Sequence, residues 1–188
     1  MEILKTPISD LLILRRKIVS DNRGFFTRLY AEKELSELGR PTNAVHINSS
    51  TSTSTGTLRG IHFQYPPYAE TKIVSCVNGA VWDVGVDLRP QSSTRFQWFG
   101  VELTPQNGLS LLIPEGFGHA FITLKPTSTL VYVLSAEYSI DHESGFKFDD
   151  PMLDIKWPIG PKVLSKKDLN WGSIESRLSE LDLNFKKK

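Results

Sequence analysis

The segment GTLRGIHFQ, from residue 56 to 64, places a histidine within a run that is typical of a β-strand. Because side chains alternate along a strand, one face should carry Leu58, Gly60, His62 and Gln64, and the other Arg59, Ile61 and Phe63. An imidazole, with a reference pKa of about 6.5, takes up and releases protons near neutral pH. Polar groups on the inner face of a small β-barrel line a ligand pocket. His62 is therefore a candidate acid or base, although a lone strand histidine is more often a hydrogen-bonded structural residue.

Metal binding is a second chemistry open to a histidine in a barrel. It needs several converging imidazole or carboxylate ligands, commonly two histidines separated by one residue on a strand. Gln64 stands where the second histidine would be, and the chain has four histidines in all. His119, in the segment PEGFGHAF, has no neighbour at ligand spacing. We therefore expect no bound metal ion.

Short strands separated by turn residues must position these side chains. Strand-type runs cover 57–63, 97–104, 109–113, 119–124 and 129–138. Two more runs, within 73–88, are joined by Asn78-Gly79, a pair suited to a tight hairpin turn. The second run carries Asp83 and Asp87 on one face and apolar residues on the other. Asp83 stands out because a carboxylate among apolar strands needs a polar partner.

Helix is expected only at the margins of the chain. One helix is predicted over 31–38, with Gly39 as its C-terminal cap, and another over about 173–182. The Ser/Thr run 49–55 is expected to be an exposed loop. Many short strands without alternating helices predict an antiparallel sandwich or barrel. Without repeats or a long linker, we expect a single domain over 1–188.

The composition narrows the class of protein. The net charge of +1 gives no reason to expect a nucleic-acid or membrane partner, and 39% hydrophobic with 23% charged residues is ordinary for a globular domain. The N-terminus lacks the pattern of a signal peptide, and no apolar run is long enough to span a bilayer. The single cysteine, Cys76, lies in an apolar run and is expected to be buried. These features favour a cytoplasmic location.

Longer motifs resemble the dTDP-4-dehydrorhamnose 3,5-epimerase family. In chain order they are DNRGFF at 21–26, GTLRGIHFQ at 56–64, NGAVWDVGVDLR at 78–89, IPEGFGHAF at 113–121, VYVLSAEY at 131–138, DDPMLDIKWP at 149–158 and LSKKD at 164–168. The spacing is nearly constant from about residue 9 to 170. The resemblance implies a mainly β, cupin-type double-stranded β-helix jelly roll with short marginal helices. It also implies a homodimer in which the N-terminal segments, about 1–50 here, contribute to the interface.

The resemblance further implies an isomerase that needs no dissociable cofactor. It would epimerise a nucleoside-diphospho-4-keto-6-deoxyhexose at C5, C3 or both, in deoxysugar and surface-polysaccharide (lipopolysaccharide, O-antigen) biosynthesis. The ketone acidifies the neighbouring C–H groups, so a base, an enolate stabiliser and an acid on the opposite face are sufficient. By resemblance these are His62, Lys72 and Tyr132, with Asp168 orienting His62. Without the resemblance, Asp168 would be interpreted as a surface residue in a helix capped by Ser165.

Further side chains match binding positions of the family. The pocket positions are Asp83, His119, Tyr138 and Glu143, and the diphosphate candidates are Arg23, Arg59 and Lys167. Guanidinium groups suit phosphate oxygens because their paired N–H donors match two oxygens at once. Phe26 would pack on the base or the sugar.

Two of the three residues expected near the nucleobase, Arg28 and His46, differ from the family pattern, and the third, Asn48, matches it. Arg28 stands where the thymidine-using enzymes resembled here carry a glutamate, and His46 replaces a glutamine close to Asn48. An arginine offers no acceptor to the N3–H of thymine, whereas cytosine presents acceptors at N3 and O2. One hypothesis is therefore a CDP-linked 4-keto-3,6-dideoxyhexose inverted at C5. In the other, Arg28 points outward or holds phosphate, and the substrate is dTDP-linked.

Three rival functions remain open at this level. A 3,4-ketoisomerase shares the fold, but an acid facing the base, as Tyr132 would, favours inversion of a centre. A non-catalytic sugar-binding jelly roll would explain a pocket, but not the joint presence of His62, Lys72, Tyr132 and Asp168. A metal-dependent oxygenase would need the missing ligands. Neither the centre inverted, nor the nucleotide, nor the pathway follows from the residues.

Overall fold

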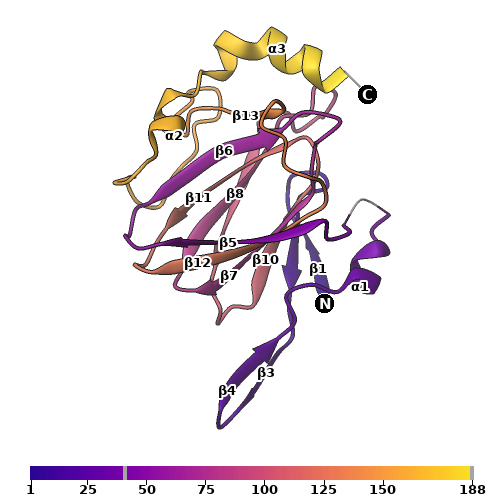
Figure 1. The fold of residues 1–188 in the computed structure, drawn as a ribbon, viewed down its shortest axis with the longest axis vertical. Helices are drawn as coiled ribbons and strands as arrows, with labels where there is room; N and C mark the ends of the chain where they lie inside the picture. The colour runs from indigo at the N-terminus through magenta and orange to yellow at the C-terminus, as the bar shows by residue number, and fades with distance from the viewer. Residues whose placement is uncertain (40–41, 187–188) are drawn as a thin grey trace.

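Two antiparallel sheets face each other in this computed structural model, which describes residues 1–39 and 42–186 (Figure 1). The six-stranded sheet has the order β1 (Glu2–Lys5), β2 (Leu12–Arg15), β10 (Leu109–Ile113), β7 (Lys72–Asn78), β12 (Ser128–Leu134) and β5 (His46–Ser52). The five-stranded sheet has the order β13 (Glu143–Gly145), β6 (Leu58–Gln64), β11 (Phe117–Thr123), β8 (Val81–Asp87) and β9 (Trp98–Leu103). The predicted mainly β jelly roll is confirmed.

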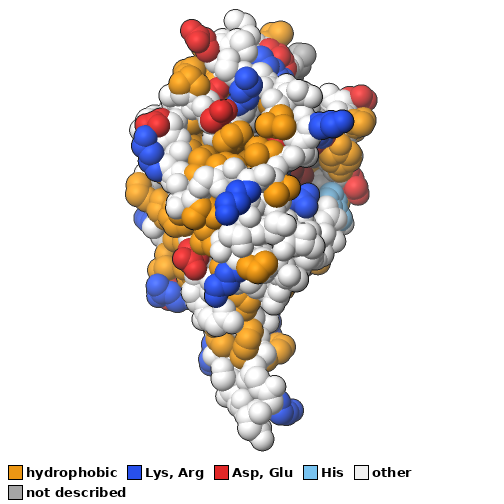
Figure 2. Space-filling view, turned by 90° about the vertical axis from the view of Figure 1, so that its left-hand side faces the viewer, with side chains coloured by type: hydrophobic (Ala, Val, Ile, Leu, Met, Phe, Trp, Pro, Cys, Tyr) orange, Lys and Arg blue, Asp and Glu red, His pale blue; other side chains and the backbone are white. Residues whose placement is uncertain are grey.

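Few elements lie outside the two sheets. They are the hairpin of β3 (Ile18–Asp21) and β4 (Gly24–Thr27) and the helices α1 (Glu32–Ser36), α2 (Lys166–Asn170) and α3 (Ile174–Lys186). The predicted marginal helices therefore exist, although the first is shorter and the last longer than expected. The β3–β4 hairpin extends away from the body of the molecule (Figures 1 and 2). Its side chains Val19, Phe25 and Phe26 are exposed.

Apolar side chains fill the sandwich and cover the outer face of one sheet and part of the outer face of the other. Between the sheets lie residues such as Leu11, Val74 and Phe121. The outer face of the five-stranded sheet packs against α3, and α1 covers part of the six-stranded sheet. Cys76 is fully buried in the central cluster, and burial raises the pKa of its thiol to about 11. Its predicted burial is confirmed.

The predicted hairpin at Asn78-Gly79 is wrong. Gly79 has the positive φ of a tight turn, 78°, but β7 and β8 belong to different sheets. Ser128 packs against this turn, where its hydroxyl donates to the carbonyl of Ala80 and accepts from its N–H. Val74 and Val81 both point into the central cluster, so the two strands face each other across the core instead of pairing. The Asn78-Gly79 pair therefore predicted a turn correctly, but the strands on either side of that turn do not pair with each other.

Much of the run 49–55 is strand, contrary to the expected loop. Residues 46–52 form β5, which pairs with all of β12 from Leu134 to Ser128. The hydroxyls of Thr51 and Thr129 lie 3.0 Å apart across this pair. As the last strand of its sheet, β5 leaves much of its surface in solvent, so its polar composition resembled that of a loop.

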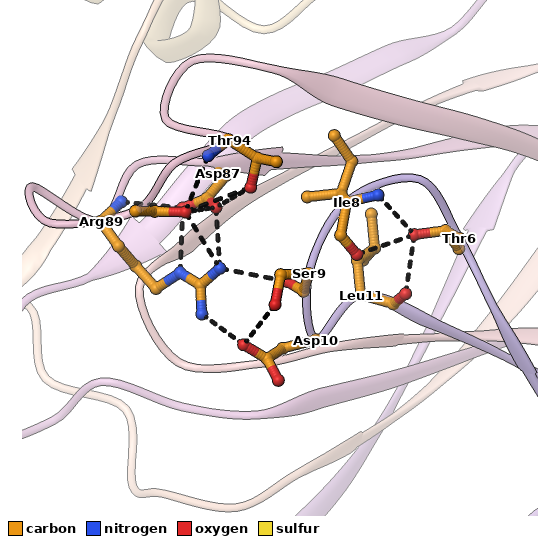
Figure 3. A network of polar contacts seen from close by, with 9 residues as sticks. Thr6, Ile8, Ser9, Asp10, Leu11, Asp87, Arg89 and Thr94 are labelled. Carbon is orange, nitrogen blue, oxygen red and sulfur yellow. Dashed lines mark hydrogen bonds and ion pairs between the residues drawn. The ribbon is translucent and has the colours of Figure 1, made fainter.

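A polar network ties the turn between β1 and β2 to the end of β8 (Figure 3). Asp87 is fully buried and accepts hydrogen bonds from Arg89, Ser92 and Thr94. Arg89 also donates to the carboxylate of Asp10, with an N–O distance of 2.8 Å. Burial raises the pKa of Asp87, but these hydrogen bonds outweigh burial and hold the pKa below its usual value.

Candidate active site

A cavity of about 660 Å³ opens between the two sheets. Its walls come from β5, β7 and β12 of one sheet and from β6 and β11 of the other, with α2 and its preceding loop at one side. Of the predicted site residues, the cavity is lined by His46, Asn48, Arg59, His62, Lys72, His119, Tyr132, Tyr138, Glu143, Lys167 and Asp168. Asp83 is buried behind this surface and reaches it through His119.

A β-bulge between β6 and β11 decides which side chains of β6 face the cavity. His62 pairs with His119 and Arg59 with Phe121, so Gly60 and Ile61 together oppose Ala120. Partners in an antiparallel pair point to the same side, which places Arg59 on the face of His62. The simple alternation that put Arg59 on the opposite face is therefore wrong.

Gly60 permits the bulge. Its φ is 117°, and a Cβ at this position would lie 2.5 Å from the carbonyl oxygen of His119. Both observations exclude a larger residue at this backbone position without rearrangement. The glycine thus places Arg59 and His62 in one wall.

His62 forms the first of two histidine–carboxylate pairs. Its Nε2 lies 2.5 Å from Oδ1 of Asp168, although 106 residues separate them in sequence. Asp168 lies on α2, where its N–H donates to the hydroxyl of the N-cap Ser165 at 3.0 Å. Ser165 therefore caps the helix as expected, but Asp168 is not a surface residue, because its carboxylate is 3% exposed and faces His62.

The Asp168 carboxylate is suited to hold a positive imidazole. Burial raises the pKa of Asp168, but the hydrogen bonds with His62 and Ser165 outweigh burial and leave the pKa below its ordinary value. The His62 side chain itself is 30% exposed. Its imidazole can therefore meet a ligand while Asp168 supports it from behind.

The second pair, His119 and Asp83, is almost fully buried. His119 Nε2 lies 2.8 Å from Oδ1 of Asp83, and the histidine ring meets Tyr132 edge-on at a centroid distance of 5.9 Å. Asp83 thus has the polar partner that its apolar surroundings required. Within residues 1–39 and 42–186, Oδ2 of Asp83 has no hydrogen-bond partner.

Tyr132 approaches the cavity from the sheet opposite His62. It lies on β12, between Asn48 of β5 and Val74 of β7, whereas His62 lies on β6. Burial raises the pKa of Tyr132 above its ordinary value, and the nearby Asp83 carboxylate raises it further. The phenol therefore stays protonated and can act as a hydrogen donor.

Lys72 is held by a residue that the sequence patterns did not single out. Its Nζ lies 3.1 Å from Oε1 of Glu70, and both side chains are largely buried. Gln64 donates to the other oxygen of Glu70 at 3.1 Å and accepts from the N–H of Ser139. The only signal for Glu70 was its place two residues before Lys72, in a loop without strand periodicity. Gln64, which replaces a possible metal ligand, orders this corner.

Glu143 joins two further candidates at the rim of the cavity. Its carboxylate accepts from Tyr138 at 2.7 Å and from Lys167 at 2.5 Å. Burial raises the pKa of Glu143, but Lys167 and Tyr138 outweigh burial and lower it overall. On β5, His46 Nδ1 lies 3.9 Å from a carboxylate oxygen of Glu137. The rim therefore holds the Lys167–Glu143 ion pair with the Tyr138 hydroxyl beside it.

Three predicted binding residues do not reach the cavity of their own chain. Arg23 pairs with Asp21 at the tip of the β3–β4 hairpin, and Phe26 is 68% exposed. Arg28 lies 3.5 Å from Glu34 and, with Phe26, lines a separate hollow of about 230 Å³. The cavity of their own chain is therefore formed without these three residues.

Two features of the described residues bear on other functions. Across 1–39 and 42–186, no group of three or more His, Cys, Asp or Glu side chains is placed to hold a metal ion. In the same part of the chain, no helix is long and apolar enough to cross a bilayer.

The sequence of the chain matches a known protein family. The model of the dTDP-4-dehydrorhamnose 3,5-epimerase family matches residues 5–176. The chain belongs to this family. The protein is therefore an isomerase of the epimerase class, and the predicted cupin-type fold agrees with solved members.

Individual members of the family resemble the chain over nearly its whole length. The dTDP-4-dehydrorhamnose 3,5-epimerase of Shigella flexneri is 43% identical over 90% of this chain and 94% of its own. The crystal structure of the Elizabethkingia anophelis epimerase has a TM-score of 0.88 at 39% identity, covering 94% of this chain and 98% of that one. The Legionella pneumophila enzyme, solved in complex with dTDP-4-keto-L-rhamnose, has a TM-score of 0.90 at 37% identity and covers 96% of each chain.

Proposed function

We propose that this epimerase inverts C5, C3 or both in a dTDP-linked 4-keto-6-deoxyhexose bound between the two sheets. The observation that carries the proposal is the His62–Asp168 pair on one side of the cavity with Tyr132 on the other. A base and an acid on opposite sides of a sugar are what inversion of a carbon centre requires. A 3,4-ketoisomerase has no comparable need for an acid opposite the base.

The proposed reaction begins with removal of a proton next to the C4 ketone. Nε2 of His62 is hydrogen-bonded to Asp168, which leaves Nδ1 to take that proton. The C–H electron pair moves into the enolate, whose O4 charge is stabilised by the ammonium of Lys72. Asp168 stabilises the imidazolium that forms. The hydroxyl of Tyr132 then gives its proton to the opposite face of the carbon. Proton exchange with solvent finally neutralises the His62 imidazolium and the Tyr132 phenolate.

The remaining candidates fit the rest of the substrate. Arg59 and Lys167 line the same cavity and supply positive charge for the diphosphate. His119, supported by Asp83, and the Tyr138–Glu143 pair are hydrogen-bonding groups suited to the sugar hydroxyls. Such nucleotide sugars feed deoxysugar and surface-polysaccharide synthesis, for which we propose a cytoplasmic location.

We further propose that the single 1–188 domain works as a homodimer. The β3–β4 hairpin carries Arg23 and Phe26 away from its own cavity and exposes apolar side chains to solvent. Exposed apolar residues on a projecting hairpin are typical of an interface. In a dimer, the hairpin of one copy would bring Arg23 and Phe26 to the cavity of the other.

The nucleotide depends on what Arg28 meets. Its guanidinium lies 3.5 Å from Glu34, so it already has an anionic partner within its own chain. This arrangement favours the hypothesis in which Arg28 does not read the base, and hence thymidine over cytidine. Calorimetric titration with dTDP and CDP tests this choice: tighter CDP binding would restore the cytidine hypothesis. An Arg28→Glu variant should leave the preference unchanged if Arg28 does not contact the base.

The reaction itself is tested by incubation in deuterated water with a dTDP-linked 4-keto-6-deoxyhexose. We expect deuterium at each carbon that is inverted, and its position identifies C3, C5 or both. If neither carbon exchanged its proton while dTDP still bound tightly, the protein would bind the nucleotide sugar without catalysing its epimerisation.

A further inference from the structure

Arg177, in the first turn of α3, connects that helix to two segments that lie beside the active site. The family match ends at residue 176, just before it. Its backbone departs from helical geometry, with φ of −124° and ψ of 15°, and its side chain is only 22% exposed. Glu180, three residues further on, accepts two hydrogen bonds from the guanidinium at 2.9 and 2.6 Å. The guanidinium is therefore fixed in direction.

The first segment that Arg177 holds is the edge strand β13. Its Nη1 donates to the carbonyl of Gly145 and its Nη2 to the hydroxyl of Ser144, both at 2.9 Å. Gly145 is the register partner of His62 on β6, and β13 also carries Glu143. A three-residue edge strand pairs on one side only, so contacts from outside the sheet contribute much of its stability.

The second segment is the end of α2, through Trp171. The Arg177 guanidinium lies 5.9 Å from the centroid of the Trp171 ring, and this ring meets the imidazole of His62 edge-on at 6.3 Å. A Cβ on Gly145 would lie 2.5 Å from the indole, so the ring occupies the space that this glycine leaves. Trp171 directly follows α2, which carries Lys167 and Asp168.

A helix as short as α2 cannot hold Asp168 in place by itself. Five residues form little more than one turn, and isolated helices of that length are unstable in water. The direction of the Asp168 carboxylate must therefore come from contacts outside α2. Two side chains of the α2 region make such contacts on the His62 side: Lys167, which pairs with Glu143 of β13, and Trp171, which lies between His62, Gly145 and Arg177.

We propose that Arg177 and Trp171 are positioning residues that hold Asp168 and β13 against His62. The inference rests on the proposed role of His62 as the base. Arg177 touches no reacting atom: it fixes β13 by hydrogen bonds and α2 through the indole. The C-terminal helix, most of which follows the residues matched by the family model, thereby sets the geometry of the His62–Asp168 pair.

The test compares Arg177→Met with a matched variant, Arg95→Met. Arg95 also ties α3 to the body, through Asp182, but it lies in the loop between β8 and β9 and does not line the cavity. Both variants lose one arginine–carboxylate contact of the same helix. The thermal midpoint, kcat and KM of each variant are compared with those of the wild-type protein, and His62→Ala is assayed in the same way.

We expect Arg177→Met to lower kcat for solvent-deuterium exchange about tenfold with KM within about twofold, because small displacements of a base slow proton transfer. Arg95→Met should keep the wild-type kcat even if its thermal midpoint falls as far. The ring ¹⁵N resonances of His62, assigned by their loss in His62→Ala, should move in Arg177→Met and not in Arg95→Met. Arg177→Lys, which keeps the charge but cannot contact Ser144, Gly145 and Glu180 together, should show the same changes and replaces Arg177→Met if that variant does not fold.

Equal kcat values and equal His62 resonances in the two arginine variants would overturn the positioning role. An inactive His62→Ala together with a fully active Arg177→Met would reject this inference and leave the proposed function intact. Full exchange by His62→Ala would instead reject the base assignment, and the ¹⁵N shifts would still report whether Arg177 orders the His62–Asp168 pair.

Discussion

At the scale of single residues, the histidines of two histidine–carboxylate pairs line one cavity and differ in their exposure. The His62 side chain is 30% exposed and has Asp168 behind it, whereas the His119 side chain is 7% exposed and contacts Tyr132. A base must reach the carbon whose proton it removes, so access selects His62. His119, locked between Asp83 and Tyr132, is better suited to fix the direction of the tyrosine ring and of a bound sugar.

Replacing His62 with alanine should lower turnover by at least about 100-fold, the usual scale for loss of a general base. The fold should survive, because the imidazole lines a cavity and fills no core space. Deuterium exchange at C3 and C5, with the thermal midpoint as the control, measures both effects. Near-normal exchange at both carbons in a folded variant would remove His62 from the mechanism.

Replacing Tyr132 with phenylalanine should separate the two proton transfers. The ring keeps its packing and loses only the hydroxyl, so His62 can still remove the proton while inversion slows. Deuterium should then enter the substrate with retained configuration, as read by NMR. Equal losses of exchange and inversion would make Tyr132 a binding residue.

At the scale of elements, the bulge in β6 is the feature on which the site depends. Gly60→Ala should destabilise the protein by at least about 2 kcal/mol, because a side chain is strained at φ of 117° and would contact the His119 carbonyl. The control is Gly160→Ala, since a Cβ at Gly160 meets no atom within 4 Å. Chemical denaturation measures both. A Gly60→Ala protein as stable as Gly160→Ala would show that the bulge adapts freely.

The network around Asp87 should make part of the protein's folding stability sensitive to acid (Figure 3). The folded pKa of Asp87 lies below its ordinary value, so its contribution is present above about pH 4 and is lost as pH falls through the folded pKa. Arg89→Met leaves a buried carboxylate unpaired and should cost about 3 kcal/mol at neutral pH. On acidification from about pH 6 to about pH 3, the variant should lose less further stability than the wild type, as measured by thermal melts.

A control for the Asp87 network is Lys156→Met, which breaks the exposed ion pair with Asp154. Exposed pairs contribute little, so the thermal midpoint and its pH dependence should match the wild type. If Arg89→Met behaved like this control, the network would have no measurable part in stability.

At the scale of the whole molecule, the proposed exchange of hairpins makes each site depend on two chains. Co-refolding His62→Ala with Arg23→Met should restore activity, because mixed dimers contain one cavity with both residues intact. If Arg23 served its own chain, no cavity in the mixture would be complete. The double variant His62→Ala/Arg23→Met, co-refolded with His62→Ala, is the control and should stay inactive.

Local patterns in the sequence predicted most of the strands and the family. Alternation along 57–63, 109–113 and 119–124 located three strands of the sandwich to within two residues. The resemblance to the family implied the jelly roll and the eleven candidates that line the cavity. These successes share one cause: strand periodicity, turn residues and motif spacing are properties of neighbouring residues along the chain.

The tertiary structure alone decided which segments meet. Packing across the core put β7 and β8 in different sheets despite the Asn78-Gly79 turn, and the bulge turned Arg59 to the side of His62. The contact of His62 with Asp168, which the family resemblance implied but no local pattern did, spans 106 residues, and Arg23 and Phe26 are absent from the cavity of their own chain. Such contacts depend on how distant segments fill a common volume, and no local periodicity encodes that packing.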